Sequence, residues 1–190
     1  MKPSTLRRAG LVSGLALIVA IAAAPSFAQE ADQSTGLGIK GIGVRLGLND
    51  PEGASSALMY GVHMDAGEFV NNVHIIPSVE YWNVGNDVGS FNSDLSDLAF
   101  KLGVNFDFPL QDQRMVPYLG GGFGFHRLKF ESNAPGVVDE SDTKFGLDLQ
   151  GGVRNQFTPN LSLFGELGYT FISDANQLRV LGGLTYHFIY

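Results

Sequence analysis

A histidine, a serine and two acids lie close together in the middle of the chain, and these residue types could support hydrolysis. His126 precedes Ser132 by six residues, and Glu131 and Glu140 lie nearby. A hydrolase uses a serine nucleophile, a histidine base and an acid that orients the histidine. The spacing matches no lipid A deacylase motif. A lipid-acting enzyme is therefore kept only as the second alternative function.

The remaining polar motifs favour structural roles over cofactor chemistry. His63, His74, His126 and His187 show no paired spacing typical of a metal site. The acidic cluster Asp139, Glu140 and Asp142 could hold a divalent cation that bridges to lipopolysaccharide phosphates, but such runs are usually solvated loops. We expect neither a metal nor a cofactor.

A glycine motif near the amino end has the literal form of a dinucleotide fingerprint. The motif runs from Gly36 to Gly41 with the sequence GLGIKG. A nucleotide site requires a strand before these glycines and a helix that opens after them. Here strand-like alternation runs through the motif, so we expect no nucleotide binding.

The elements that must position these residues are eight segments with period-two alternation, which predicts β-strands. Turn-rich stretches separate the segments, and no helical period appears after residue 28. The expected strands are Leu37–Leu48, Ala57–Gly67, Val73–Asn83, Asp97–Phe108, Val116–Phe130, Thr143–Gln156, Leu161–Phe171 and Leu178–Tyr190.

The two faces of these strands differ sharply in charge. One face is apolar and aromatic in all eight segments, with Lys40 as its single charge. The other face carries many glycines and the charged residues Arg45, Asp65, Glu80, Asp97, Lys101, Asp107, Lys144, Asp148, Arg154, Glu166 and Arg179. The four histidines fall on this second face.

Two architectures fit such strands: a soluble barrel or sandwich with the apolar face inside, and a membrane barrel with that face outside. Glycines on a solvated face would only weaken a soluble sheet. Inside a narrow barrel they make room for long charged side chains and Trp82. The sequence therefore predicts an all-β fold, an eight-stranded antiparallel transmembrane β-barrel.

Connection lengths orient the predicted barrel, because periplasmic turns are short and extracellular loops longer. The expected inner turns are Glu68–Asn72, Pro109–Met115 and Thr158–Asn160. The expected outer loops are Asn49–Ser56, Val84–Ser96, Glu131–Asp142 and Ile172–Gln177.

The amino end reads as a cleavable signal peptide, residues 1–28, followed by one barrel domain, residues 29–190. Lys2, Arg7 and Arg8 precede an apolar stretch, and Ala28 ends a small-residue cleavage site. Removing three of 12 basic residues leaves nine against 19 acids, so the net charge moves from −7 to −10. Such acidity argues against a nucleic-acid partner.

Charges inside an eight-stranded barrel must be paired, because its interior is just wide enough for side chains to fill. We expect a polar network that plugs the lumen, formed by Arg45, Glu80, Lys101, Asp148, Arg154 and Glu166. A plug argues against a wide pore. A small-solute channel remains the first alternative function.

The carboxyl-terminal strand and two internal stretches then resemble a known family. The run Pro117–Gly124, the strand Pro77–Trp82 and the aromatic ending Tyr186, Phe188 and Tyr190 are similar to small bacterial outer-membrane barrels of the OmpA/OmpX type, often called porin-family proteins. Members commonly end in Phe, where this chain ends in Tyr190.

The resemblance implies a location in a Gram-negative outer membrane, among its lipid and lipopolysaccharide. It also implies that the barrel assembly machinery recognises Tyr186, Phe188 and Tyr190 as an assembly signal. We expect a monomer with a non-enzymatic role in envelope integrity or in surface interaction through the extracellular loops.

Overall fold

The computed structural model describes residues 36–88, 91–110, 115–132, 139–173 and 175–188. The predicted signal peptide and Tyr190 lie outside these ranges. No helix in the described ranges is long and apolar enough to cross a membrane.

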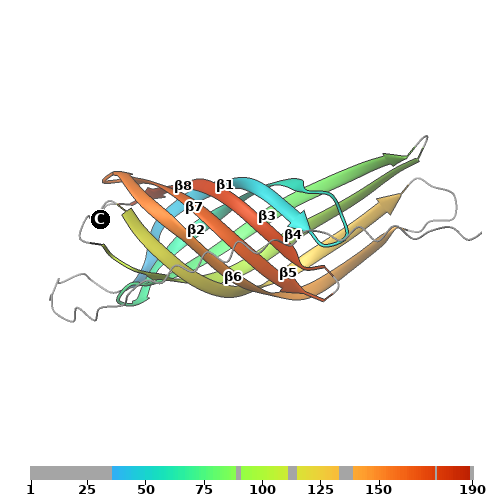
Figure 1. Cartoon of the computed structure of the whole chain (residues 1–190). Coiled ribbons are helices and arrows are strands. Elements are labelled where there is room, and N and C mark those ends of the chain that lie inside the picture. Colours follow the sequence, from blue (N-terminus) through green and yellow to red (C-terminus); the bar gives the residue numbers. More distant parts are fainter. Residues whose placement is uncertain (1–35, 89–90, 111–114, 133–138, 174, 189–190) are drawn as a thin grey trace, which may run out of the picture. The chain divides into compact units, whose positions relative to one another are not determined.

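Eight antiparallel strands form one closed barrel in which each strand pairs with its sequence neighbours (Figure 1). The last strand closes the barrel on the first, from Gly41 opposite His187 to Pro51 opposite Gln177. The predicted fold class is confirmed. The strands are β1 (Leu37–Pro51), β2 (Ala57–Val70), β3 (Val73–Val88), β4 (Phe91–Asp107), β5 (Met115–Ser132), β6 (Glu140–Thr158), β7 (Leu161–Ile172) and β8 (Gln177–His187).

Side-chain alternation gives the barrel an apolar exterior and a polar interior. Leu46 is 57% exposed and Leu149 59%, whereas their neighbours on the other face, Arg45 and Asp148, are each 5% exposed. All eleven charged residues predicted to face inward are buried or half-buried. An exterior of this kind must be surrounded by lipid, because a monomeric soluble protein rarely exposes so large a continuous apolar surface.

A bulge near the end of β2 changes which way its side chains point. Gly67 has a φ of 86°, a conformation that favours glycine, and the β2–β3 ladder shifts register between His63 and Glu68. Glu68 consequently pairs with His74, and its carboxylate lies 3.2 Å from the imidazole. Phe69 beside it is 66% exposed. The turn to β3 is tighter than the predicted Glu68–Asn72.

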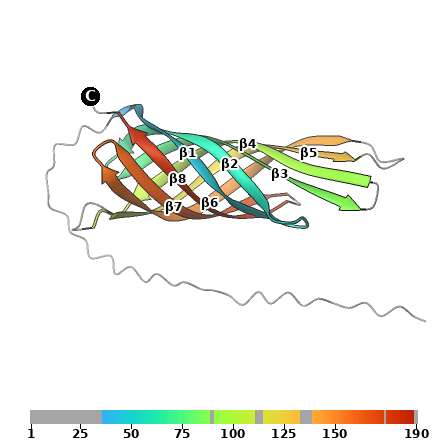
Figure 2. The ribbon, with the colours of Figure 1, turned by 90° about the horizontal axis from the view of Figure 1, so that it is seen from above.

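The predicted outer loop Val84–Ser96 is strand throughout its described residues, and both ends of a second predicted loop, Glu131–Asp142, are strand as well, so this part of the prediction was wrong. Residues 133–138 of the second loop lie outside the described ranges. The β3–β4 ladder continues from Asn83 opposite Ser96 to Val88 opposite Phe91, and the β5–β6 ladder reaches Phe130 opposite Glu140. Backbone pairing persists there although the outward residues have become polar. The β1–β2 and β7–β8 hairpins end earlier. As a result β3 to β6 project beyond the remaining strands as a four-stranded sheet (Figure 2).

Candidate functional site

The centre of the barrel is occupied by an ion-pair network built around Glu80 on β3. Arg45 reaches across β2 and places Nη1 2.6 Å from Oε1 of Glu80. Arg179 from β8 and Lys101 from β4 bind the other carboxylate oxygen, Oε2, at 2.8 and 3.0 Å. Glu80 itself is 2% exposed. Three cations from three different strands therefore converge on one buried carboxylate.

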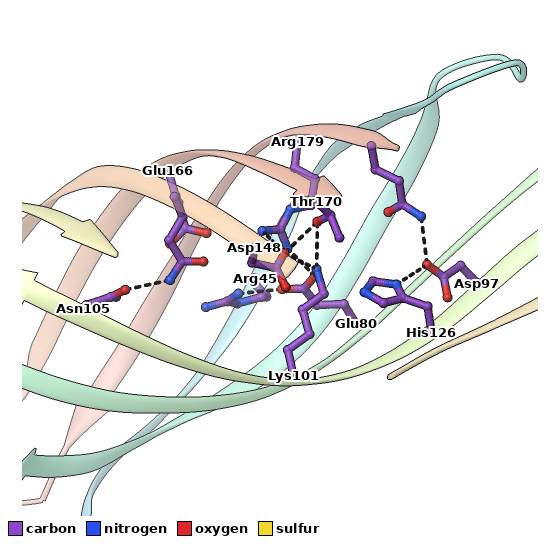
Figure 3. A network of polar contacts seen from close by, with 12 residues as sticks. Arg45, Glu80, Asp97, Lys101, Asn105, His126, Asp148, Glu166, Thr170 and Arg179 are labelled. Atoms are coloured by element: carbon purple, nitrogen blue, oxygen red, sulfur yellow. Dashed lines mark hydrogen bonds and ion pairs between the residues drawn. The ribbon is translucent and has the colours of Figure 1, made fainter. Parts of the chain in front are cut away.

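Asp148 on β6 completes this central cluster (Figure 3). Its Oδ1 accepts from Lys101 Nζ at 3.1 Å, from Thr170 Oγ1 at 2.6 Å and lies 2.9 Å from Arg179 Nη2. Three cations thus face two carboxylates, a formal net charge of +1. Since desolvating each ion is costly, the geometry must supply the compensation, and removing one partner would leave an uncompensated buried charge.

Glycines on the neighbouring strands make room for these long side chains. Each glycine stands directly across a ladder from one of them: Gly61 opposite Arg45, Gly124 opposite Lys101, Gly122 opposite Asp148 and Gly168 opposite Arg179. A Cβ on Gly168 would lie 2.8 Å from Arg179 Nη2, and one on Gly124 would lie 2.8 Å from Lys101 Cγ. The predicted role of the inward glycines is confirmed at these positions.

Two residues of the predicted network do not join the central cluster, which corrects the expectation of a single network. Arg154 on β6 pairs instead with Asp107 on β4, with Nη1 3.0 Å from Oδ2. Glu166 on β7 accepts a hydrogen bond from the hydroxyl of Tyr118 at 2.9 Å. Arg45, Glu80, Lys101 and Asp148 do meet. Arg179 was recognised as inward-facing but was missing from the predicted network.

The four histidines lie inside the barrel, as predicted, and each has a polar partner. His63 contacts Thr185 at 2.9 Å, and His187 contacts Ser162 at 2.8 Å. The ring of His74 lies 3.3 Å from Asp65. His126 is fully buried, with Nδ1 2.8 Å from Asp97. The histidines thus belong to separate polar contacts.

The residues of the hypothetical hydrolase are not brought together. His126 points into the barrel, whereas Ser132 stands at the far end of β5 with its hydroxyl 3.1 Å from that of Ser93. Glu131 binds Lys129, and Glu140 lies on β6 opposite Phe130. Ser132 lies six residues along the strand from His126, roughly 20 Å at strand spacing.

Apolar side chains close the lumen beside the charged cluster. Met59, Trp82 and Leu181 are almost fully buried together with Ala57, and half-buried Val84, Leu95, Leu128 and Phe164 pack against them. Two small cavities among the inward residues, both bordered by Arg45, measure about 20 and about 10 Å³. Such spaces hold at most about one water each. A hollow of about 880 Å³ is lined mainly by outward apolar residues such as Val44, Val62 and Phe100.

The acidic segment Asp139–Asp142 does not form a compact cation site in the structure. Asp139 accepts from the backbone N–H of Ser132 at 3.2 Å, while Glu140 and Asp142 lie on β6. Within the described ranges, no group of three or more His, Asp or Glu residues is arranged to hold a metal ion.

A closed antiparallel barrel with a lipid-facing exterior and paired charges inside defines an integral membrane protein of the β-barrel class. The outer membrane protein β-barrel domain family matches residues 13–188. The chain belongs to this family and is a bacterial outer-membrane protein. A comparison with curated proteins found no match.

Solved outer-membrane barrels share the fold at low sequence identity. Neisserial surface protein A is 18% identical, with a TM-score of 0.60 over 78% of this chain and 96% of that one. Ail, the attachment invasion locus protein of Yersinia pestis, in complex with the heparin analogue sucrose octasulfate, is 17% identical, with a TM-score of 0.55 over 80% and 100%. The N-terminal barrel of Pseudomonas aeruginosa OprF is 14% identical, with a TM-score of 0.53 over 80% and 99%.

The predicted assembly signal lies at the seam of the barrel. Tyr186 on β8 is 50% exposed on the outside, and its ring centre lies 5.7 Å from that of Phe188. The backbone N–H of Phe188 donates to the carbonyl of Lys40 at 2.8 Å, which continues the closing ladder. Recognition by the assembly machinery stays a prediction.

Glu80→Gln should destabilise the barrel by about 3–5 kcal/mol, because it leaves three buried cations with one carboxylate. Urea unfolding of protein refolded into lipid vesicles measures this change. Glu131→Gln is the control: Glu131 is 49% exposed and its carboxylate forms a surface ion pair with Lys129, so its loss should cost at most ~1 kcal/mol. Equal effects of the two substitutions would refute the central role of Glu80.

Gly168 and Gly165 lie three residues apart on β7. Gly168→Ala and Gly165→Ala therefore test which face of the strand points into the lumen and which faces lipid. A Cβ on Gly168 collides with Arg179, whereas one on Gly165 meets nothing within 4 Å. Overpacking should cost about 1–3 kcal/mol at Gly168, and Gly165→Ala should be neutral or mildly stabilising. The same unfolding experiment measures both, and a larger loss at Gly165 would contradict the assigned faces.

Proposed function

We propose that the protein is a non-conducting, non-enzymatic outer-membrane barrel that presents the β3–β6 sheet to a partner at the cell surface. The observation that carries this proposal is the combination of a filled lumen with four strands that continue past the other hairpins. A channel would need an open lumen, and an enzyme would need a convergent site. The projecting sheet serves neither purpose and is the part of the barrel best placed for contact.

The charge of the projecting sheet favours a basic partner. Among the described residues of the β3–β6 sheet beyond the apolar band, the exposed acids Asp94, Glu131, Asp139, Glu140 and Asp142 outnumber the exposed cations Arg127 and Lys129. Charge complementarity of this kind steers association and suppresses wrong partners. A polysulfated glycan, like the heparin analogue bound to Ail, would be repelled from this end of the sheet.

Backbone pairing offers a second source of affinity for a basic polypeptide. The β6–β7 ladder begins only at Gly146 opposite Ile172, so residues 140–145 of β6 pair with β5 on one side alone. An extended segment can add itself to such an edge through main-chain hydrogen bonds. The names of two similar structures, a surface protein and an attachment invasion locus protein, agree with a role in surface contact.

Purified protein in planar lipid bilayers should show no steady, large conductance, because the central cluster and the apolar side chains fill the lumen. The variant that combines Arg45→Ser with Glu80→Ser removes one charge of each sign and two large side chains. It should conduct more than the parent protein. A stable open channel in the parent would favour the solute-channel alternative over the proposed function.

Shortening the sheet should abolish surface binding while the barrel still folds. One variant replaces residues 84–95 and 128–142 with two-residue hairpin turns, which join directly paired positions such as Asn83 and Ser96. Cells that display the parent should bind a fluorescent, extended lysine-rich peptide and should not bind sucrose octasulfate. The shortened barrel should bind neither.

Heat-dependent gel mobility verifies that the shortened variant is folded. Unchanged peptide binding by a folded, shortened barrel would show that the projecting sheet is not the contact surface.

A further inference from the structure

A change in the outward residues marks where the apolar band of the barrel ends on its outer side. On five strands the last outward apolar residues are Leu48, Tyr81, Leu98, Phe125 and Phe145. The next outward residues are Asp50, Asn83, Ser96, Arg127 and Thr143. Of these last five residues only Arg127 is a cation. In the membrane this level corresponds to the polar headgroups that border the hydrocarbon.

The neighbours of Arg127 turn this position into a patch of hydrogen-bond donors. Arg127 pairs with Thr143 across the β5–β6 ladder. Lys129, two residues farther along the same face, pairs with Ser96 on β4 and Ser141 on β6. Directly paired residues bring their Cβ atoms to about 4.5–5.5 Å. Two cations and three hydroxyls therefore share one outward surface, which we call the β5 patch.

An aromatic wall lies directly on the membrane side of the β5 patch. Phe123, Phe125 and Phe145 are 44%, 55% and 53% exposed. The ring of Phe145 packs 6.1 Å from that of Phe123 and 5.9 Å from that of Phe125. A lipid beside β5 therefore meets an apolar wall along its acyl chains and cations at its headgroup.

We propose that the β5 patch binds a phosphate group of a glycolipid in the outer leaflet. A guanidinium offers paired donors that match two phosphate oxygens, and an ammonium adds a point charge. Arg127 has no acidic partner within the described part of the chain, whereas Lys129 binds Glu131 at 2.7 Å. Arg127 is therefore the primary phosphate ligand, and the hydroxyls of Thr143 and Ser96 are placed to donate beside it.

Acids beyond the patch fix the level at which a phosphate can bind. Asp94 and Glu131 pair with each other one step past Lys129. A phosphate displaced outward would meet these carboxylates, while one displaced inward would enter hydrocarbon. The same acids repel a soluble polyanion that approaches from outside. The β5 patch thus selects a phosphate delivered by the membrane over one free in solution.

Folded protein in detergent should retain lipid A that carries its phosphates about tenfold better than chemically dephosphorylated lipid A. Native mass spectrometry of the protein–lipid complexes measures the retention. Arg127→Gln combined with Lys129→Gln should abolish the preference. Lys144→Gln is the matched control, because its Nζ donates to the carbonyl of Ser173 instead of facing lipid, and it should keep the preference.

Three results would overturn the proposal. They are equal retention of the two lipids by the parent protein, an equal loss of preference in Lys144→Gln, and displacement of lipid A by inorganic phosphate or sucrose octasulfate at matched concentration. Heat-dependent mobility ensures that every variant compared is folded. Arg127→Gln removes no acid and leaves the β6 edge intact, so the lysine-rich peptide should still bind this variant at least as well as it binds the parent. Loss of the lipid preference with retained peptide binding therefore separates the two proposals.

Discussion

The constraint on which the structure depends is the absence of water in the hydrocarbon core of a bilayer. Every backbone N–H and C=O there must find a partner within the protein, and strands can satisfy this only by closing on themselves. The β1–β8 ladder from Gly41 to Pro51 makes that closure. Once eight strands are closed, the width of the interior is set. The composition of the inward face then follows from how much can fit inside.

Limited width explains why glycines and long charged side chains occur as cross-strand partners. Arg45 can reach Glu80 only because Gly61, the residue between them along the ladder, has no side chain. Arg179 lies against Gly168 for the same reason. The ion pairs therefore depend on the glycines across the ladder. The charges give the interior a defined packing, and the glycines make that packing sterically possible.

The fold and both faces could be predicted from sequence, because successive residues of a strand point to opposite faces and apolar alternation therefore shows which face meets lipid. The pairing of charges was less predictable. Glu80 pairs with Gly61, Gly61 pairs with Arg45, and Arg45 pairs with Gly183. Arg45 and Glu80 therefore lie at the same level on nearby strands, and their ion pair could be predicted. Arg179 lies four residues beyond Gly183 and reaches Glu80 through the tilt of the strands, which one sequence does not reveal. The bulge at Gly67, which turns Glu68 inward, was hidden for a similar reason.

The outer loops were predicted wrongly because strands were identified by outward apolar residues, and these residues stop where the apolar band of the barrel ends. Beyond Phe125 and Phe145 the strands still pair, but their outward residues are Arg127, Lys129, Thr143 and Ser141. That loss of apolar alternation is itself informative. The position where the pattern fails on each strand marks the membrane boundary, and the residue types found there describe the headgroup that must lie beside them. The hydroxyls and cations on β5 and β6, with acids farther out, are the residues on which the proposed phosphate contact rests.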